Sequence, residues 1–252
     1  MSGVKQGPRS SVFTTMRFSK NQGVFLLENH LNRLRLHADK LRIDASKIDF
    51  DSILDLLQKN PPDLTEGLLR LECTSSLELR LSYRPFSIQN EQVDAITVPS
   101  KVWPKRVAGT KHGEWKSYGD ARERAERHGA DLALLIHNYS IIDCDRCTPL
   151  ILDEDGVIWR SSSELSVDSI TFELLEDELV MKGFFIQRGI LNERLVARCV
   201  EAIAVGSGVN VLKIDSIDGE PIGNESSFLF EHCVSILDGQ YKNENLWTEV
   251  WE

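Results

Sequence analysis

The N-terminal part of the chain alternates between strand-like and helix-like patterns of apolar residues. Residues 12–18, VFTTMRF, are rich in β-branched and aromatic side chains, which is typical of a strand. Leucines recur at helical spacing within 23–43, so this stretch is expected to form a helix that buries one apolar face. Residues 49–60 predict a second amphipathic helix, with Asp51 or Ser52 as its N-cap and a Pro-Pro pair as its stop.

Two further apolar runs, 68–76 and 77–86, are interpreted as the paired strands of a hairpin. The stretch that follows, 87–107, has few periodic signals, so we expect it to connect two domains. The predicted organisation is a small N-terminal domain at 1–95, an interdomain linker at 96–107 and a larger C-terminal domain at 108–252.

The C-terminal part repeats this mixture of elements. A helix that ends near Gly129 precedes three strand-like runs, and a tight DEDG turn separates the last two. A helix that ends at Gly183, a strand, a helical run at 191–200, a strand pair around Gly206 and a final helix follow. This order predicts two α+β halves with mixed sheets, because it lacks a regular βα repeat.

Composition limits the classes of function. The 252 residues are 41% hydrophobic and 27% charged, which is ordinary for a globular protein and long enough to bury a core. A formal net charge of −10 argues against a nucleic-acid partner, because an acidic surface repels phosphate backbones. No apolar run reaches the roughly 18 residues of a membrane span, and the polar N-terminus lacks the apolar core of a secretory signal.

The five cysteines are irregularly spaced, so a disulfide framework is not expected and a reducing, cytoplasmic location is. Cys144 and Cys147 form a lone CxxC with no second pair of ligands, so no metal site is expected. Gly-x-Ser-x-Gly, Walker A, GxGxxG and HExxH motifs are all missing from the sequence. Their absence disfavours serine hydrolases, nucleoside-triphosphate enzymes, dinucleotide binders and zinc proteases.

Seven short motifs then occur in a characteristic order: FTTMR, LLENHLNRLRLHADKL, TKH with GADLALL, IIDCDRCTPLIL, SIT, VEAIAVGSG and SIDGEPIG. Together they resemble the class IV pyridoxal-phosphate (PLP) enzymes, which include branched-chain aminotransferases, D-amino acid aminotransferases and 4-amino-4-deoxychorismate lyases. The resemblance runs from about Phe13 to Gly223. It implies the two-domain α+β architecture of fold type IV, with a small N-terminal α/β sandwich, a larger C-terminal pseudo-barrel and a homodimeric assembly.

The resemblance assigns chemistry to the lysine of TKH, Lys111. It implies that Lys111 forms a reversible covalent link with the PLP aldehyde and then moves protons to and from the bound substrate. The link requires an uncharged amine, which a desolvated, cation-rich pocket favours. Read from the composition alone, Lys111 would be a solvated lysine at the start of a helix, and only the order of the motifs favours the functional role. Lys116, five residues later, is the alternative candidate.

The other cofactor contacts follow from the same resemblance. Arg33 would bind the phosphate with a bidentate fork. Ile170 and Thr171 at a helix start, and Gly206 and Ser207 in a small-residue turn, would offer backbone N–H groups and hydroxyls to the same phosphate. Their alternative roles are a surface arginine, a helix cap and a strand bend.

Asp143 stands where the family has the glutamate that pairs with the pyridine nitrogen, and it is one methylene shorter. Arg17 is expected to meet a substrate carboxylate if its side chain faces the site. His30 is interpreted as a packing residue, and Arg146 and Tyr118 are weaker candidates for substrate contacts.

The chain departs from the family pattern in three places. Only about a dozen polar residues precede Phe13, against the roughly 25 of the family, Thr148 followed by Pro149 replaces a common asparagine, and WRSSS replaces TPPL. The C-terminal segment 243–252 carries two tryptophans that pack either on the core or on a partner.

Three functions remain. The first is a PLP-dependent lyase that converts 4-amino-4-deoxychorismate into 4-aminobenzoate and pyruvate in folate biosynthesis, which the FTTMR and TKH motifs favour. The second is an aminotransferase that acts on branched-chain or D-amino acids. The third is a non-catalytic relative that binds a ligand or partner, which the departures favour.

Overall fold

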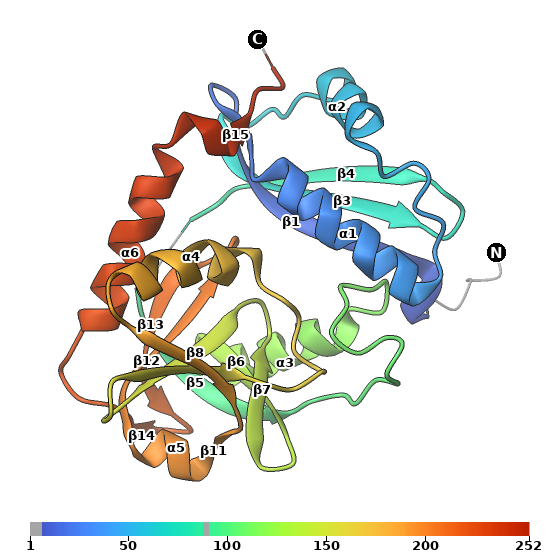
Figure 1. Cartoon of the computed structure of the whole chain (residues 1–252). Coiled ribbons are helices and arrows are strands. Elements are labelled where there is room, and N and C mark those ends of the chain that lie inside the picture. The colour runs from blue at the N-terminus through green and yellow to red at the C-terminus, as the bar shows by residue number, and fades with distance from the viewer. Residues whose placement is uncertain (1–6, 88–90, 252) are drawn as a thin grey trace. The chain divides into compact units, whose positions relative to one another are not determined.

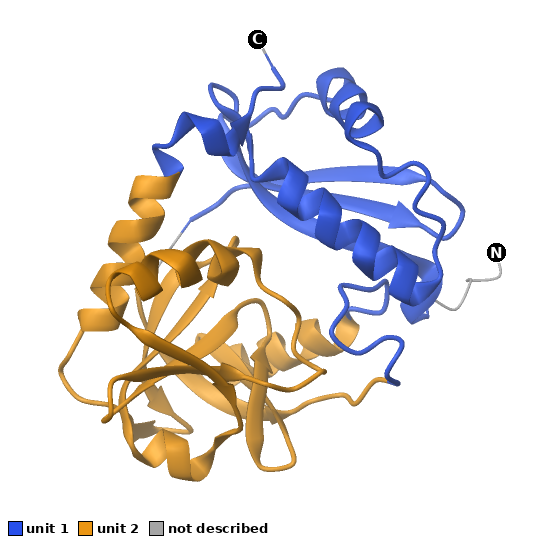
Figure 2. Ribbon diagram, in the orientation of Figure 1, with its two compact units in different colours: residues 1–87, 104–115, 241–252 blue, residues 88–103, 116–240 orange. Residues whose placement is uncertain are grey.

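The computed structural model describes residues 7–87 and 91–251, which form two compact units (Figures 1 and 2). Unit 1 takes in residues 1–87, 104–115 and 241–252, and unit 2 takes in 88–103 and 116–240. These units differ from the predicted domain ranges, because the segment with Lys111 and the C-terminal segment both group with the N-terminal residues. The N-terminal residues 1–6, part of the connecting stretch (88–90) and Glu252 lie outside the described residues.

Unit 1 is built on a five-stranded sheet with the order β15-β2-β1-β3-β4, in which all neighbours are antiparallel. Its strands and helices are η1 (Pro8–Ser10), β1 (Ser11–Ser19), β2 (Gly23–Phe25), α1 (Leu27–Leu41), α2 (Phe50–Lys59), β3 (Glu66–Thr74), β4 (Leu79–Arg84), η2 (Glu244–Leu246) and β15 (Trp247–Thr248). The prediction of mixed sheets in both halves is therefore wrong for unit 1. Its strands are joined by hairpins or lie side by side in opposite directions.

Helix α1 packs along β1 and buries the leucine face that the spacing predicted. Leu31, Leu34 and Leu41 on that face are completely buried. The helix begins at Leu27, because residues 23–25 form the short strand β2 and Leu26 takes a left-handed φ of 50°. This buried helix face fixes which α1 side chains point toward β1.

The N-cap of helix α2 lies two or three residues before the predicted ones. The N-cap is Asp49, whose carboxylate accepts a hydrogen bond from the N–H of Ser52 at 2.8 Å. The choice of Asp51 or Ser52 is therefore wrong, because both lie inside the first turn. The helix ends at Lys59, just before the predicted Pro-Pro stop.

Unit 2 is built on a larger mixed sheet with the order β10-β9-β8-β12-β13-β5-β6-β7-β11, from which β14 branches at β13. Its strands are β5 (Gln92–Pro99), β6 (Leu132–His137), β7 (Ser140–Cys144), β8 (Thr148–Asp153), β9 (Val157–Ser161), β10 (Phe185–Gly189), β11 (Leu191–Asn192), β12 (Cys199–Gly206), β13 (Asn210–Ile217) and β14 (Glu220–Pro221). Its helices are α3 (Lys116–Arg127), α4 (Ile170–Met181), α5 (Glu193–Ala197) and α6 (Phe228–Tyr241). Strands β7 and β11 also contact β9, so the sheet curls back on itself into a pseudo-barrel.

Two predictions fail in unit 2. The stretch taken as a connection contains β5, which pairs in parallel with both β13 and β6 in the middle of the sheet. The predicted helical run at 191–200 is helical only over Glu193–Ala197, and Cys199 already begins β12. Both segments are short, so local pattern is outweighed by pairing with distant strands.

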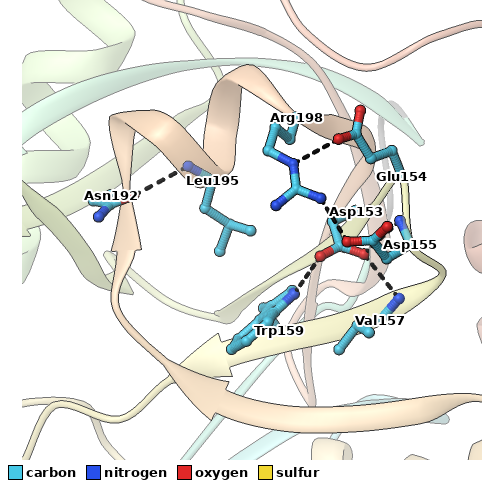
Figure 3. Close-up of polar contacts among 8 residues, drawn as sticks. All are labelled: Asp153, Glu154, Asp155, Val157, Trp159, Asn192, Leu195 and Arg198. Atoms are coloured by element: carbon cyan, nitrogen blue, oxygen red, sulfur yellow. Dashed lines mark hydrogen bonds and ion pairs between the residues drawn. The ribbon is translucent and has the colours of Figure 1, made fainter.

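The predicted DEDG turn joins β8 to β9 and is anchored by a buried carboxylate (Figure 3). Asp153 is 3% exposed and accepts from the N–H of Val157 (2.9 Å) and the indole of Trp159 (2.8 Å). On the outside, Arg198 bridges Glu154 and Asp155. These contacts are structural.

The two C-terminal tryptophans pack within unit 1. Trp247 lies in β15, which pairs with β2, and its ring contacts Phe25 at a centroid distance of 5.1 Å. The Trp251 indole donates to the carbonyl of Leu57 at 2.9 Å and its ring meets Phe18. The tail thus completes the N-terminal sheet.

Among the described helices, none is long and apolar enough to cross a membrane.

Candidate active site

Lys111 lies in unit 1, in the segment 108–113 that runs beside β1. Its carbonyl oxygen accepts a hydrogen bond from the N–H of Phe13 (3.1 Å), and its own N–H donates to Nδ1 of His37 on α1 (3.2 Å). Gly109 has a φ of +69°, a left-handed conformation that favours glycine. Both hydrogen-bonding groups of the Lys111 backbone are thus engaged within unit 1.

The Lys111 side chain is partly buried and lies against aromatic rings. Nζ is 4.9 Å from the ring centroid of Trp115 and 5.5 Å from that of Phe13, which is within cation–π range. Lys116, by contrast, is 81% exposed and pairs with Asp120 one helical turn later. That pair has the geometry of an ordinary surface ion pair. Lys111 is therefore the better placed of the two lysines for chemistry.

Arg33 lies on α1 and its guanidinium reaches β1. Nη2 donates to Oγ1 of Thr14 at 3.0 Å, and the same hydroxyl lies 2.8 Å from Nδ1 of His30. Arginine can only donate, so the Thr14 hydroxyl accepts from Arg33, and the same hydroxyl is hydrogen-bonded to His30. His30 thus does more than pack, because this chain of hydrogen bonds holds the guanidinium in place.

Two buried histidines near Arg33 and Lys111 have lowered pKa values. Burial lowers the pKa of His30 well below its ordinary value, and the positive charges of Arg33 and Lys111 lower it further. Burial and the same two cations bring the pKa of His37 to about 3. Both rings therefore stay uncharged at neutral pH. A surrounding in which positive charges already disfavour another one suits an anion.

In unit 2, Ile170 and Thr171 open α4. The hydroxyl of Ser169 caps the helix and accepts from the N–H of Phe172 at 3.2 Å. The first N–H groups of a helix have no partner within it, and the helix dipole adds positive potential there. Oγ1 of Thr171 lies 3.3 Å from Oγ of Ser207, in the turn between β12 and β13. Two of the predicted phosphate-binding segments are therefore adjacent.

Gly206 ends β12 at a point where the backbone is crowded. An added Cβ would lie 3.3 Å from the carbonyl oxygen of Arg146 and 3.4 Å from Cys147, so its neighbours would have to shift.

Cys144 and Cys147 are free, buried thiols. Within residues 7–87 and 91–251, no group of three His, Cys, Asp or Glu side chains is arranged to hold a metal ion.

Asp143 lies on β7 and is 4% exposed. Its carboxylate accepts from the N–H groups of Val167 and Cys144, each at 3.0 Å. Val167 precedes α4 by three residues, so this contact ties β7 to the segment that leads into the helix. Burial raises the pKa of Tyr118, and the charge of Asp143 contributes. Asp143 is thus an oriented carboxylate beside an uncharged phenol.

Arg17 carries its charge between two aromatic rings. Its guanidinium lies 3.9 Å from the ring centroid of Phe86 and 4.3 Å from that of Tyr241. Stacking leaves the N–H edge of a guanidinium able to donate. Arg146 has a different setting, because it pairs at 2.6 Å with Asp145, whose side chain is 1% exposed. Arg146 therefore neutralises a buried carboxylate.

Comparison with known proteins decides the family. A model of the class IV amino-transferase family matches residues 11–217. The chain belongs to this family. A search of curated proteins found no match.

Solved structures of the class IV family share the fold over nearly the whole chain. The branched-chain aminotransferase of the archaeon Thermoproteus uzoniensis, solved with norvaline, has a TM-score of 0.80 at 16% identity, covering 96% of this chain and 90% of the other. A provisionally assigned 4-amino-4-deoxychorismate lyase gives 0.75 at 23% (96% and 92%). One from Legionella pneumophila gives 0.77 at 15% (95% and 96%). These likenesses show fold type IV, a small antiparallel sheet with a larger pseudo-barrel.

Class IV enzymes bind PLP, and the groups described above are of the kinds that this cofactor requires. Unit 1 offers a partly buried amine and an arginine, and unit 2 offers hydroxyls at a helix N-terminus and a buried carboxylate. Sequence reasoning missed Thr14 and His37. His37 follows Arg33 by four residues on the same helix face, a spacing that could have revealed it.

Proposed function

We propose that this chain is a PLP-dependent lyase that converts 4-amino-4-deoxychorismate into 4-aminobenzoate and pyruvate. The observation that carries the proposal is the setting of Lys111, whose amine lies near two aromatic rings and whose backbone N–H is held by the uncharged His37. In this proposal Lys111 forms the covalent link to the cofactor aldehyde. The link requires the uncharged form of the amine.

The family resemblance assigns the remaining cofactor contacts. Arg33 would bind the phosphate. The backbone of Ile170 and Gly206 and the hydroxyls of Thr171 and Ser207 would bind it too, and Asp143 would hold the proton on the pyridine nitrogen. When bound, PLP supplies an electron sink that stabilises negative charge at the substrate carbon. The amine of Lys111 takes a proton from the substrate and returns one.

Two arginines on one face of β1 and β3 support an anionic substrate. Arg70 pairs across the strands with Thr15, two residues from Arg17, and its guanidinium lies 3.6 Å from the ring centroid of Phe13. Nζ of Lys111 lies 5.5 Å from the centroid of the same ring. Arg17 and Arg70 are therefore the proposed partners of substrate carboxylates.

The second candidate is an aminotransferase acting on branched-chain or D-amino acids. The observation in its favour is the TM-score of 0.80 with a branched-chain aminotransferase, which is higher than the 0.75 and 0.77 of the two lyase structures. The lyase is preferred because FTTMR and TKH resemble the lyase versions of these motifs. For either activity we also propose a homodimer, as the family resemblance implies, and a cytoplasmic location, as the irregularly spaced cysteines suggest.

The first test of the proposed function is the visible absorbance of bound PLP, and the second is the identity of the reaction products. The purified protein incubated with PLP should become yellow, and borohydride should abolish the visible band by reducing the covalent link. Lys111→Ala should lose this band and about 10²- to 10⁴-fold or more in turnover, the usual contribution of a positioned proton-transfer group. Lys116→Ala is the matched control and should behave as the wild type.

Products separate the candidates. Incubation with 4-amino-4-deoxychorismate should release fluorescent 4-aminobenzoate and an equal amount of pyruvate. Amino-group transfer to 2-oxoglutarate, with no 4-aminobenzoate, would select the aminotransferase instead. A protein that stays colourless and takes up no PLP would contradict both and leave a non-catalytic binding role.

A further inference from the structure

One face of α1 carries Arg33 and also contacts the segment that contains Lys111. His30 and Arg33 on this face are tied to Thr14 of β1. One turn further along, His37 accepts the N–H of Lys111 at 3.2 Å, and Lys40 donates to the carbonyl of Ala108 at 2.6 Å. The same helix therefore holds the arginine and the lysine segment. These are the parts that the proposed function assigns to the phosphate and the aldehyde.

We propose that His37 is a positioning residue that fixes the backbone of Lys111 relative to Arg33. The proposal rests on the proposed function, in which Lys111 links covalently to PLP. The cofactor is rigid, so the amine and the phosphate contact must be spaced to within a fraction of an ångström for the link to form efficiently. The Lys111 peptide is held on one side by His37 and on the other by the N–H of Phe13, which donates to its carbonyl at 3.1 Å.

The hydrogen bond to Lys111 also determines the state of the imidazole. Nδ1 accepts a proton, so in the neutral ring the hydrogen is on Nε2. His37 is 7% exposed, and burial together with Arg33, Lys111, Lys40 and His112 keeps its pKa at about 3. A protonated ring would set a donor against the donor N–H of Lys111. The acceptor is thus maintained at every pH at which an amine could be deprotonated.

Three substitutions separate the acceptor from the bulk of the ring. His37→Asn keeps an acceptor close to the position of Nδ1, His37→Gln moves it by one methylene, and His37→Leu removes it. The measurement is the rate of borohydride-trapped attachment of PLP, and separately of pyridoxal, to Lys111, located by peptide mass spectrometry. Unfolding of the cofactor-free protein reports whether each variant is folded.

His37→Leu and His37→Gln should slow the attachment of both aldehydes by about ten- to a hundredfold, as an ångström-scale misplacement does. His37→Asn should remain close to the wild type. Thr14→Val, which removes the hydroxyl that holds Arg33, should slow PLP but not pyridoxal, because pyridoxal has no phosphate. If His37→Leu does not fold, the role of His37 is tested by comparing the attachment rates of His37→Gln and His37→Asn.

Two results would overturn the role of His37 while leaving the proposed function intact. One is attachment at the wild-type rate in both His37→Gln and His37→Leu. The other is a loss confined to PLP, which would place His37 on the phosphate side. A wild-type protein that attaches neither aldehyde at Lys111 would instead show that the proposed function itself is wrong.

Discussion

At the scale of single residues, the proposed site in unit 1 depends on a short chain of hydrogen bonds. Arg33 donates to the Thr14 hydroxyl, which is also hydrogen-bonded to His30, and burial and nearby cations keep His30 uncharged. The hydroxyl can serve both neighbours, because it has two acceptor lone pairs and one donor hydrogen. The guanidinium therefore does not need to reorganise to meet an anion, and such preorganisation favours binding.

Arg33→Lys tests this arrangement. Lysine keeps the charge but loses the planar fork, so one charge-assisted hydrogen bond to the phosphate should disappear. PLP affinity, measured by titrating the visible absorbance of the cofactor-free protein, should fall by about ten- to a hundredfold. Arg42→Lys, at the exposed end of the same helix, is the control. Equal affinities in the two variants would argue against a phosphate role for Arg33.

Motif order in the sequence selects Lys111, Arg33, Asp143 and Thr171, and their roles remain predictions. The sequence can place His37 on the same helix face as Arg33, but it does not reveal which distant residues these side chains contact. The hydrogen bond between His37 and Lys111 joins residues 74 positions apart, and that between Val167 and Asp143 joins residues 24 apart. Such contacts depend on how α1, β1 and the loops pack, and no local pattern encodes that packing.

At the scale of elements, local signals located those that have caps, turns or repeated apolar faces. Helix α4 ends at its predicted glycine, where Gly183 has a φ of +91°, and Gly156 closes the DEDG turn at +78°. Strand β5 was not predicted, because it has few buried positions and its partners, β13 and β6, lie far along the chain. Strand β15 was not predicted either, because it is two residues long and its partner, β2, also lies far along the chain.

The cap of α2 gives a prediction at this scale. The hydroxyl and the N–H of Ser52 lower the pKa of Asp49. A carboxyl whose pKa is lower in the folded state stabilises the fold above its unfolded pKa, and this stabilisation is lost as the pH falls through the folded value. Asp49→Ala should therefore lower the unfolding temperature at neutral pH. The difference from the wild type should shrink in acid below the carboxyl pKa.

Thermal unfolding followed by circular dichroism across this pH range measures the effect. Asp51→Ala is the matched control, and it should lower the unfolding temperature less, because Asp51 lies in the first turn and does not cap the helix. A difference between Asp49→Ala and the wild type that persists unchanged in acid would contradict the cap.

At the scale of the whole molecule, a strand from the C-terminal segment pairs with an N-terminal strand in unit 1. Strand β15 pairs with β2, and the approach is so close that a Cβ on Gly23 would lie 1.8 Å from the carbonyl oxygen of Thr248. Gly23 also has a φ of +99°, which other residues rarely adopt. The N-terminal sheet is therefore completed only after the rest of the chain has been synthesised.

Removal of residues 243–252 should destabilise unit 1 by about 2–4 kcal/mol, because it takes away two partly buried tryptophans and an edge strand. Amide hydrogen exchange in β1 and β2 should accelerate, while exchange in the β12–β13 pair of unit 2 should change little. Gly23→Ala should act in the same direction, because its methyl group displaces β15. Glu244→Ala, an exposed change in the tail, should leave exchange unaltered.

The units in which hydrogen exchange accelerates after truncation show what the tail does. Acceleration confined to β1 and β2 would mean that the tail acts as a strand of the N-terminal sheet. It would also loosen the sheet on which Phe13 and Thr14 hold Lys111 and Arg33, so PLP attachment should slow together with exchange protection. Equal acceleration in both units would instead mean that the chain unfolds as one cooperative body. Unchanged exchange after truncation would refute a structural role for β15.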